Sequence, residues 1–176
     1  MWPQRTLQSA TLRQVADPTG TSYKVHLAST YGALAMSLPE RTRFSNFTLE
    51  VTLDLGESTE VSAGVVFRNQ GESDLADEAY VLYINPEGTF GLARIEDRTW
   101  NYLQPAITTA AINPYGVQRL RVTCDGNTIA IAINDQAVGR YYAKLTAPGQ
   151  VGLYAGTWGA EPLDVIFSQL RIVPLP

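Results

Sequence analysis

The chain has 176 residues, of which 45% are hydrophobic and 17% charged, and its formal net charge is −4. This length and composition are typical of a globular domain with a full core, and they exclude a disordered chain. The sequence also lacks the basic runs of a nucleic-acid-binding protein, and no stretch approaches the ~20 continuous apolar residues of a membrane span.

Apolar and polar residues alternate along much of the first half of the chain. The clearest case is residues 47–55, where Phe47 and every second residue after it are apolar, and the residues between them are polar. Such a strand places one face on a core and the other in water, as in an antiparallel sheet. Further strands are predicted at residues 21–29, 62–69, 80–84 and 90–95.

The second half continues the pattern with tight turns between strands. Strands at 120–124 and 129–133 flank Gly126, and Gly tolerates the positive φ that a hairpin turn requires. Another turn is predicted at Asn134 and Asp135. The remaining predicted strands are residues 138–142, 151–155 and 163–173. This succession of short strands predicts an all-β fold, a two-sheet antiparallel sandwich, with residues 1–176 as one domain.

Four side chains form a candidate ligand-binding surface. Strand alternation places Tyr83 on the face opposite the apolar set of its own strand, and it places Arg68 opposite the core in the strand before. Trp100 and Tyr102 are expected in or beside a polar loop, and Trp158 lies in a glycine-rich segment. Flat aromatic rings beside polar groups suit sugars, so we assign Arg68, Tyr83, Trp100 and Trp158 to ligand binding. The alternative is ordinary aromatic packing at sheet edges.

Carboxylates are the candidates for catalysis or metal binding. Glu50 and Asp54 share the polar face of one strand, ~13 Å apart at the usual strand rise, whereas a glycosidase pair needs roughly 5–10 Å. The alternative is an exposed polar strand face, and we assign no catalytic residue. Residues 72–78 hold four carboxylates. A calcium site is one interpretation of this loop and a solvated loop is the other, because the spacing is not that of an EF-hand. No other metal or cofactor is expected.

The single cysteine is best interpreted as a core residue. Cys124 occupies an apolar position of a predicted strand, where a thiol packs as a small hydrophobic group. A nucleophilic cysteine requires an oriented base, and the single histidine, His26, is distant in sequence.

Four sets of motifs, in this order, resemble the concanavalin A-like lectin/glucanase superfamily. They are FSNFTLEV at 44–51; AGVVFR at 63–68 with YVLYI at 80–84; QRLRVTCDG at 118–126 with IND at 133–135; and GQVGLYAG at 149–156 with VIF at 165–167. The resemblance covers about residues 20–173 and is strongest to the bacterial branch of 3-keto-disaccharide hydrolase-like and laminin-G-like domains. It implies a jelly-roll sandwich that binds ligands on its concave face.

The resemblance also implies a functional class. Members are often extracellular or cell-surface modules of larger proteins, although residues 1–6 have no apolar signal-peptide core. The acid and nucleophile strand of the glucanases and the metal-binding Asp/Asn cluster of the legume lectins have no match here. We therefore expect a non-catalytic module that binds a glycan or another extracellular polymer. A glycoside or 3-keto-glycoside hydrolase and a protein-interaction domain remain alternatives.

Overall fold

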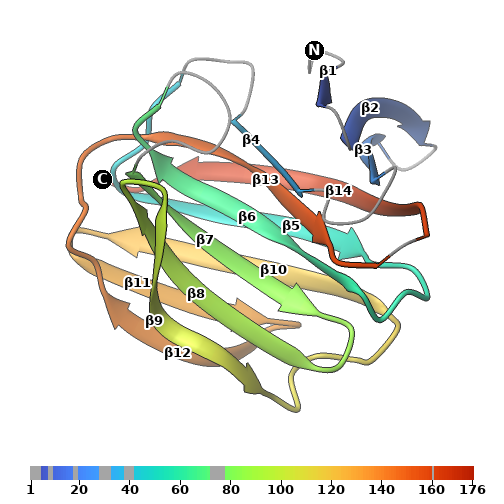
Figure 1. The fold of residues 1–176 in the computed structure, drawn as a ribbon. Coiled ribbons are helices and arrows are strands. Elements are labelled where there is room, and N and C mark those ends of the chain that lie inside the picture. Colours follow the sequence, from blue (N-terminus) through green and yellow to red (C-terminus); the bar gives the residue numbers. More distant parts are fainter. Residues whose placement is uncertain are drawn as a thin grey trace.

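The protein folds as two antiparallel β-sheets stacked face to face (Figure 1). The structure is a computed structural model that describes residues 5–7, 10–17, 20–27, 33–37, 42–71, 78–159 and 161–176, with side chains for 22–27, 42–71, 78–159 and 161–176. Among these residues, no helix is long and apolar enough to cross a membrane.

The described residues form fourteen strands, which divide between the two sheets. The eight-stranded sheet has the order β1 (Arg5–Leu7), β2 (Ala10–Asp17), β3 (Gly20–Leu27), β14 (Leu163–Pro174), β5 (Phe47–Asp54), β10 (Val117–Asp125), β11 (Thr128–Ile133) and β12 (Gln136–Tyr142). The six-stranded sheet has the order β4 (Ala33–Ser37), β13 (Gln150–Thr157), β6 (Val61–Asn69), β7 (Glu78–Asn85), β8 (Thr89–Glu96) and β9 (Thr99–Thr108). The all-β, two-sheet antiparallel sandwich predicted from the sequence is confirmed.

The main hydrophobic core lies between the sheets and is built by strict alternation. In β5, Phe47, Leu49 and Val51 are at most 1% exposed, and the residues between them are half-buried. In β7, Tyr80 and Leu82 enter the same core, while Tyr83 points away from it. The alternation expected for both strands is therefore confirmed.

The predicted hairpin turns are also found. Gly126 has a φ of 53°, and Asn134 and Asp135 have φ values of 49° and 64°. Two successive residues with positive φ are typical of the type I′ turns whose twist matches a β-hairpin. Asp97 and Arg98, with φ values of 50° and 63°, make the same kind of turn between β8 and β9.

Trp100 and Tyr102 were expected in or beside a polar loop, and no strand was predicted there. The structure places both in β9, an edge strand of the six-stranded sheet that begins directly after the turn at Asp97 and Arg98. The alternation of apolar and polar residues is weak here, because much of the surface of this edge strand is exposed to solvent. Pro105 also interrupts the run, and proline is tolerated at a sheet edge, where its missing N–H breaks no ladder.

Arg68 was expected on the exposed outer side of β6, and this expectation is also wrong. The residue has a φ of 49°, and the register between β6 and β13 shifts beside it. This bulge turns the side chain toward the interior, where it is 0% exposed.

The buried guanidinium of Arg68 binds three backbone carbonyls from separate loops. Nη2 donates to Ser45 O at 2.7 Å and to Gly126 O at 2.8 Å, Nη1 donates to Leu145 O at 3.0 Å, and Nε donates to Ser45 O at 3.2 Å. Gly126 joins β10 to β11, and Ser45 immediately precedes β5. Arg68 therefore ties the six-stranded sheet to loops of the eight-stranded sheet.

Replacing Arg68 tests this role. Arg68→Met should lower the free energy of unfolding by about 3 kcal/mol, because it removes the donors that bind three backbone carbonyls, one of them buried at Leu145. Arg68→Lys should also destabilise the fold, because a single ammonium cannot reproduce the planar fork of donors. Urea denaturation measures both effects. The exposed Arg140→Met is the matched control, and equal stabilities of the Arg68 and Arg140 variants would contradict the role.

Candidate ligand-binding site

The candidate site lies on the outer face of the six-stranded sheet, on the side away from the main core. A second, smaller hydrophobic cluster is buried on this face and consists of Val66, Ala79, Val81 and Ile95. Tyr83, Trp100 and Tyr154 pack against it. The outer face therefore carries an aromatic layer over an apolar floor, instead of the polar face of an ordinary solvated sheet.

Tyrosine and glycine alternate across four neighbouring strands of this face. Tyr154 of β13 pairs with Gly64 of β6, Gly64 pairs with Tyr83 of β7, and Tyr83 pairs with Gly91 of β8. A Cβ atom at Gly91 would overlap the ring of Tyr83. The absence of a side chain at Gly91 thus leaves the space in which the Tyr83 ring packs flat against the sheet.

Strand β9 bends over one end of the face and brings Trp100 onto it. The β8–β9 register shifts twice, around Leu92, and in Figure 1 β9 crosses in front of β8. The Trp100 ring lies 6.3 Å from that of Tyr83 and 5.9 Å from that of Tyr154, at interplanar angles of 69° and 61°. Three strands separate β9 from β13 in the sheet order, so this contact requires the bend.

The opposite end of the face carries Trp158 and two polar side chains. Trp158 is 45% exposed, and its backbone N–H donates to Glu60 O at 3.2 Å. The hydroxyls of Ser62 and Tyr154 lie 3.3 Å apart. Asn85 Nδ2 donates to Thr89 Oγ1 at 2.9 Å. Asn85 Oδ1 is buried and has no partner among the described residues.

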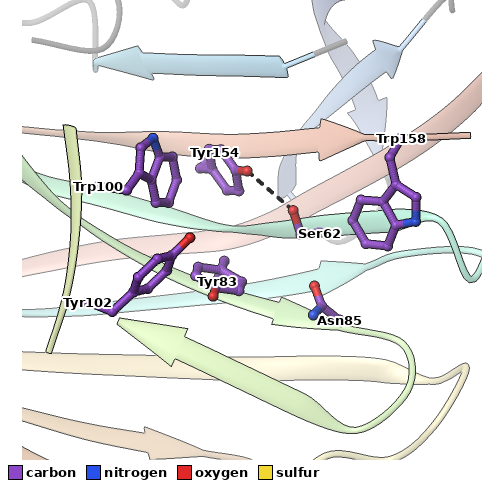
Figure 2. Close-up of a pocket in the computed structure, with 7 residues that line it drawn as sticks. All are labelled: Ser62, Tyr83, Asn85, Trp100, Tyr102, Tyr154 and Trp158. Atoms are coloured by element: carbon purple, nitrogen blue, oxygen red, sulfur yellow. Dashed lines mark hydrogen bonds between the residues drawn. The ribbon is translucent and has the colours of Figure 1, made fainter. Parts of the chain in front are cut away.

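Together these side chains line an open recess of about 450 Å³, the aromatic recess (Figure 2). Its lining residues are Ser62, Tyr83, Asn85, Trp100, Tyr102, Tyr154 and Trp158. Figure 2 shows the two tryptophans at opposite ends, with Tyr83, Tyr154 and Ser62 between them and Tyr102 beside Trp100. A recess with aromatic walls and a few polar groups is typical of a small-molecule or glycan site.

The aromatic recess is uncharged. None of its seven lining residues is a carboxylate or a cation. Burial, together with the neighbouring phenols of Tyr102 and Tyr154, raises the pKa of Tyr83 to about 12. Burial also raises the pKa of Tyr154, and this effect is larger than that of the hydrogen bond with Ser62, which lowers it. These phenols are therefore neutral at physiological pH and able both to donate and to accept hydrogen bonds.

Comparison with solved structures identifies the fold. The Bacillus subtilis carbohydrate binding module CBM66 matches with a TM-score of 0.62 and 15% identity, over 93% of this chain and 94% of that one. A Bacteroides ovatus family 16 endo-glucanase in complex with G4G3G-2F-DNP matches with a TM-score of 0.68 and 9% identity, over 92% and 85%. Sheep galectin-11 in complex with glycerol matches with a TM-score of 0.56 and 10% identity, over 82% and 98%.

The chain has the concanavalin A-like jelly-roll fold. This confirms the jelly-roll fold that the resemblance implied. No protein-family model and no curated protein matches the chain. At these identities the concanavalin A-like matches establish the fold alone, and the function must be argued from the site.

The structure brings together three of the four predicted site residues. Tyr83, Trp100 and Trp158 line one recess, although they come from β7, β9 and the segment after β13. Arg68 is buried elsewhere and does not belong to the recess. Whether the three bind a ligand stays a prediction.

Four lining residues were missed: Ser62, Asn85, Tyr102 and Tyr154. Strand alternation from Tyr83 places Asn85 on the same face, so the sequence contained that signal. Alternation also places Ser62 on the face opposite Phe67. Alternation in the predicted strand 151–155 also places Tyr154 on the face opposite Leu153, so that signal was present too. Tyr102 joins the site through the bend of β9, which no local pattern predicts.

The candidate carboxylates lie on the far side of this concanavalin A-like sandwich. Glu50 is in β5 of the other sheet, where Arg121 Nε donates to Glu50 Oε1 at 2.6 Å. Asp54 accepts from Gly56 N at 2.9 Å. The thickness of two packed sheets therefore separates both groups from the recess.

The metal and cysteine interpretations have different outcomes. Most of the acidic segment, residues 72–77, lies outside the described residues, and Glu78 pairs with Arg94 Nη2 at 2.9 Å. The described residues contain no group of three or more metal-ligating side chains.

Cys124 is 0% exposed and burial raises its pKa to about 12, as expected of a core thiol. His26 pairs with Asp164 at 2.8 Å.

Gly91→Ala tests the seat of the Tyr83 ring. The new methyl group should lift the ring and weaken ligand binding, while the fold survives because the end of a side chain moves more easily than backbone. Calorimetric titration with a saccharide that the wild type binds measures the loss of affinity, and circular dichroism verifies the fold. Gly116→Ala is the matched control, since a Cβ there meets its nearest atom at an ordinary 3.5 Å. Unchanged affinity in both variants would contradict the assignment.

The alkaline dependence of stability tests the burial of Tyr83. Its phenol has an ordinary pKa of 10.0 in the unfolded chain and about 12 in the fold. Between these values the unfolded state binds fewer protons than the folded state, so stability falls as pH rises. Urea titrations over this window should show a shallower fall for Tyr83→Phe than for wild type. Equal slopes would show that the fold does not perturb this phenol.

Proposed function

We propose that this chain is a non-catalytic carbohydrate-binding module and that the aromatic recess is its glycan site. The observation that carries the proposal is the pair of tryptophans at opposite ends of an uncharged recess, with tyrosine rings and hydroxyl groups between them. The apolar C–H faces of a sugar ring stack on aromatic rings, while its hydroxyls need donors and acceptors at their edges.

Asn85 supports a ligand with hydroxyl groups. A buried amide oxygen without a partner is costly, and Oδ1 of Asn85 is such an atom at the edge of the recess. A ligand hydroxyl that donates in this region would supply the missing interaction after a small movement of the side chain. The hydroxyls of Ser62 and Tyr154 lie beside it and can bind further ligand oxygens.

Three solved structures with this fold are described as a carbohydrate binding module, a family 16 endo-glucanase in complex with G4G3G-2F-DNP and a galectin in complex with glycerol. The first of these descriptions supports a carbohydrate ligand, because that protein has the same architecture. The proposal includes an extracellular or cell-surface location, as a module that attaches a larger protein to a polymer. It assigns no catalysis, because none of the described residues that line the recess is a carboxylate that could serve as acid, base or nucleophile.

Affinity electrophoresis and calorimetry test the proposal. The panel is mixed-linkage β-glucan, xylan, galactomannan, starch and a fructan. We expect at least one polysaccharide to retard the protein, and Trp158→Ala and Tyr102→Ala each to weaken binding about tenfold or more, as expected for aromatic anchors. Trp158 and Tyr102 are 45% and 53% exposed, so their removal should leave the fold intact.

The matched control is Tyr115→Ala, since this tyrosine is 58% exposed and lines no part of the recess. Absence of binding to every polysaccharide by the folded protein would refute the proposal. A reducing-sugar assay on the same panel tests the hydrolase alternative. Release of reducing sugars would show that the protein is a hydrolase and would contradict the non-catalytic proposal.

A protein-interaction domain is the second candidate, because Trp158 is a large apolar side chain left 45% exposed. Sedimentation velocity over a range of concentrations distinguishes the two. Self-association that Trp158→Ala abolishes, without any glycan binding, would favour this candidate.

A further inference from the structure

A second recess lies beside the aromatic recess, at the open side of the sandwich. Its volume is about 240 Å³, and its lining residues are Tyr80, Arg94, Glu96, Asn101, Tyr102, Leu103, Tyr142 and Lys144. These residues come from β7, β8 and β9 of one sheet and from the end of β12 and the segment after it in the other. We call it the charged recess, because it contains ionic side chains where the aromatic recess has none.

The two recesses meet at Tyr102, which lines both of them. Successive residues of β9 point to opposite faces of the strand. Trp100 accordingly faces the aromatic recess, and Asn101 and Leu103 face the charged recess. Tyr102 is 53% exposed and lies in β9 at the edge of the sheet, where it is the side chain that the two recesses share.

The charged recess contains both hydrogen-bond donors and acceptors. Arg94 Nη2 contacts Glu78 Oε1 at 2.9 Å and Glu96 Oε1 at 3.0 Å, and the Arg94 side chain is only 14% exposed. This buried guanidinium orients the carboxylate of Glu96, which is 47% exposed. Lys144 is exposed and forms no ion pair with the carboxylates that the structure describes.

These groups match the hydroxyls of a sugar. A sugar hydroxyl both donates and accepts, so the carboxylate of Glu96 can accept a hydrogen bond from one, and Lys144 and the amide of Asn101 can donate to one. Hydrogen bonds to charged groups are stronger than those between neutral groups. Tyr142, which is 67% exposed, adds an aromatic ring at the mouth of the recess.

We infer that the charged recess is a distal subsite for a further sugar residue of the same glycan, reached across Tyr102. The ligand is therefore an oligosaccharide chain long enough to occupy both recesses, and a disaccharide occupies the aromatic recess alone. This inference rests on the proposed function, since it requires a glycan in the aromatic recess.

The two lysines of the sequence, Lys24 and Lys144, provide a direct test. Reductive ¹³C-methylation keeps their charge and gives each a resolved methyl signal, assigned with Lys144→Arg. The probes are disaccharides and hexasaccharides prepared from each polysaccharide of the panel above. Tryptophan fluorescence reports the aromatic recess in the same titrations, because Trp100 and Trp158 both line it.

We expect a disaccharide to change the fluorescence without moving the Lys144 signal, and the matching hexasaccharide to change both. Lys24 is the internal control: it pairs with Asp164 at 2.8 Å in the eight-stranded sheet and should not respond. A hexasaccharide that changes the fluorescence but leaves Lys144 unmoved would overturn the distal subsite and leave the proposed function standing. No response from either probe would overturn both.

Calorimetry with variants gives an independent measure. The hexasaccharide should bind the wild type about tenfold more tightly than the disaccharide, an advantage expected from a few additional contacts. Tyr142→Ala and Lys144→Ala should remove most of this advantage and leave the affinity for the disaccharide unchanged. Tyr115→Ala, which alters neither recess, should retain it. Equal losses for short and long probes would contradict a separate subsite.

Discussion

The buried guanidinium of Arg68 is the constraint on which the rest of the structure depends. A bulge in β6 turns this side chain between the sheets, where it binds carbonyls of Ser45, Gly126 and Leu145. A buried cation is stable only when its donors are satisfied, so it fixes the three loops relative to the six-stranded sheet. The same inward turn removes a cation from the outer face of β6, which therefore presents only small and neutral residues to the site.

The neutral outer face explains how the site is built. Glycines beside Tyr83 and Tyr154 leave room for rings on the sheet, and the apolar floor beneath them excludes water. The bend of β9 then closes one end with Trp100, and the segment after β13 closes the other with Trp158. The result is a preorganised aromatic surface, whose rigidity limits the entropy that ligand binding would cost.

Local pattern predicted much of the sandwich and part of the site. Alternation identified β5 and β7 and oriented Tyr83 correctly, because a half-buried strand has a period of two. It failed at Arg68, since one residue with positive φ reverses the side-chain direction after the bulge. It also failed at β9, an edge strand whose polar residues and Pro105 imitate a loop.

The sequence by itself determined the fold class, the apolar side of each regular strand and the aromatic residues available for a site. These follow from side-chain periodicity and turn chemistry, which act over a few residues. Only the tertiary structure decided that Trp100 meets Tyr154 across three intervening strands, that Arg68 is buried, and that Tyr102 lies between two recesses. Those relations depend on bulges and sheet curvature, which bring together residues far apart in the chain.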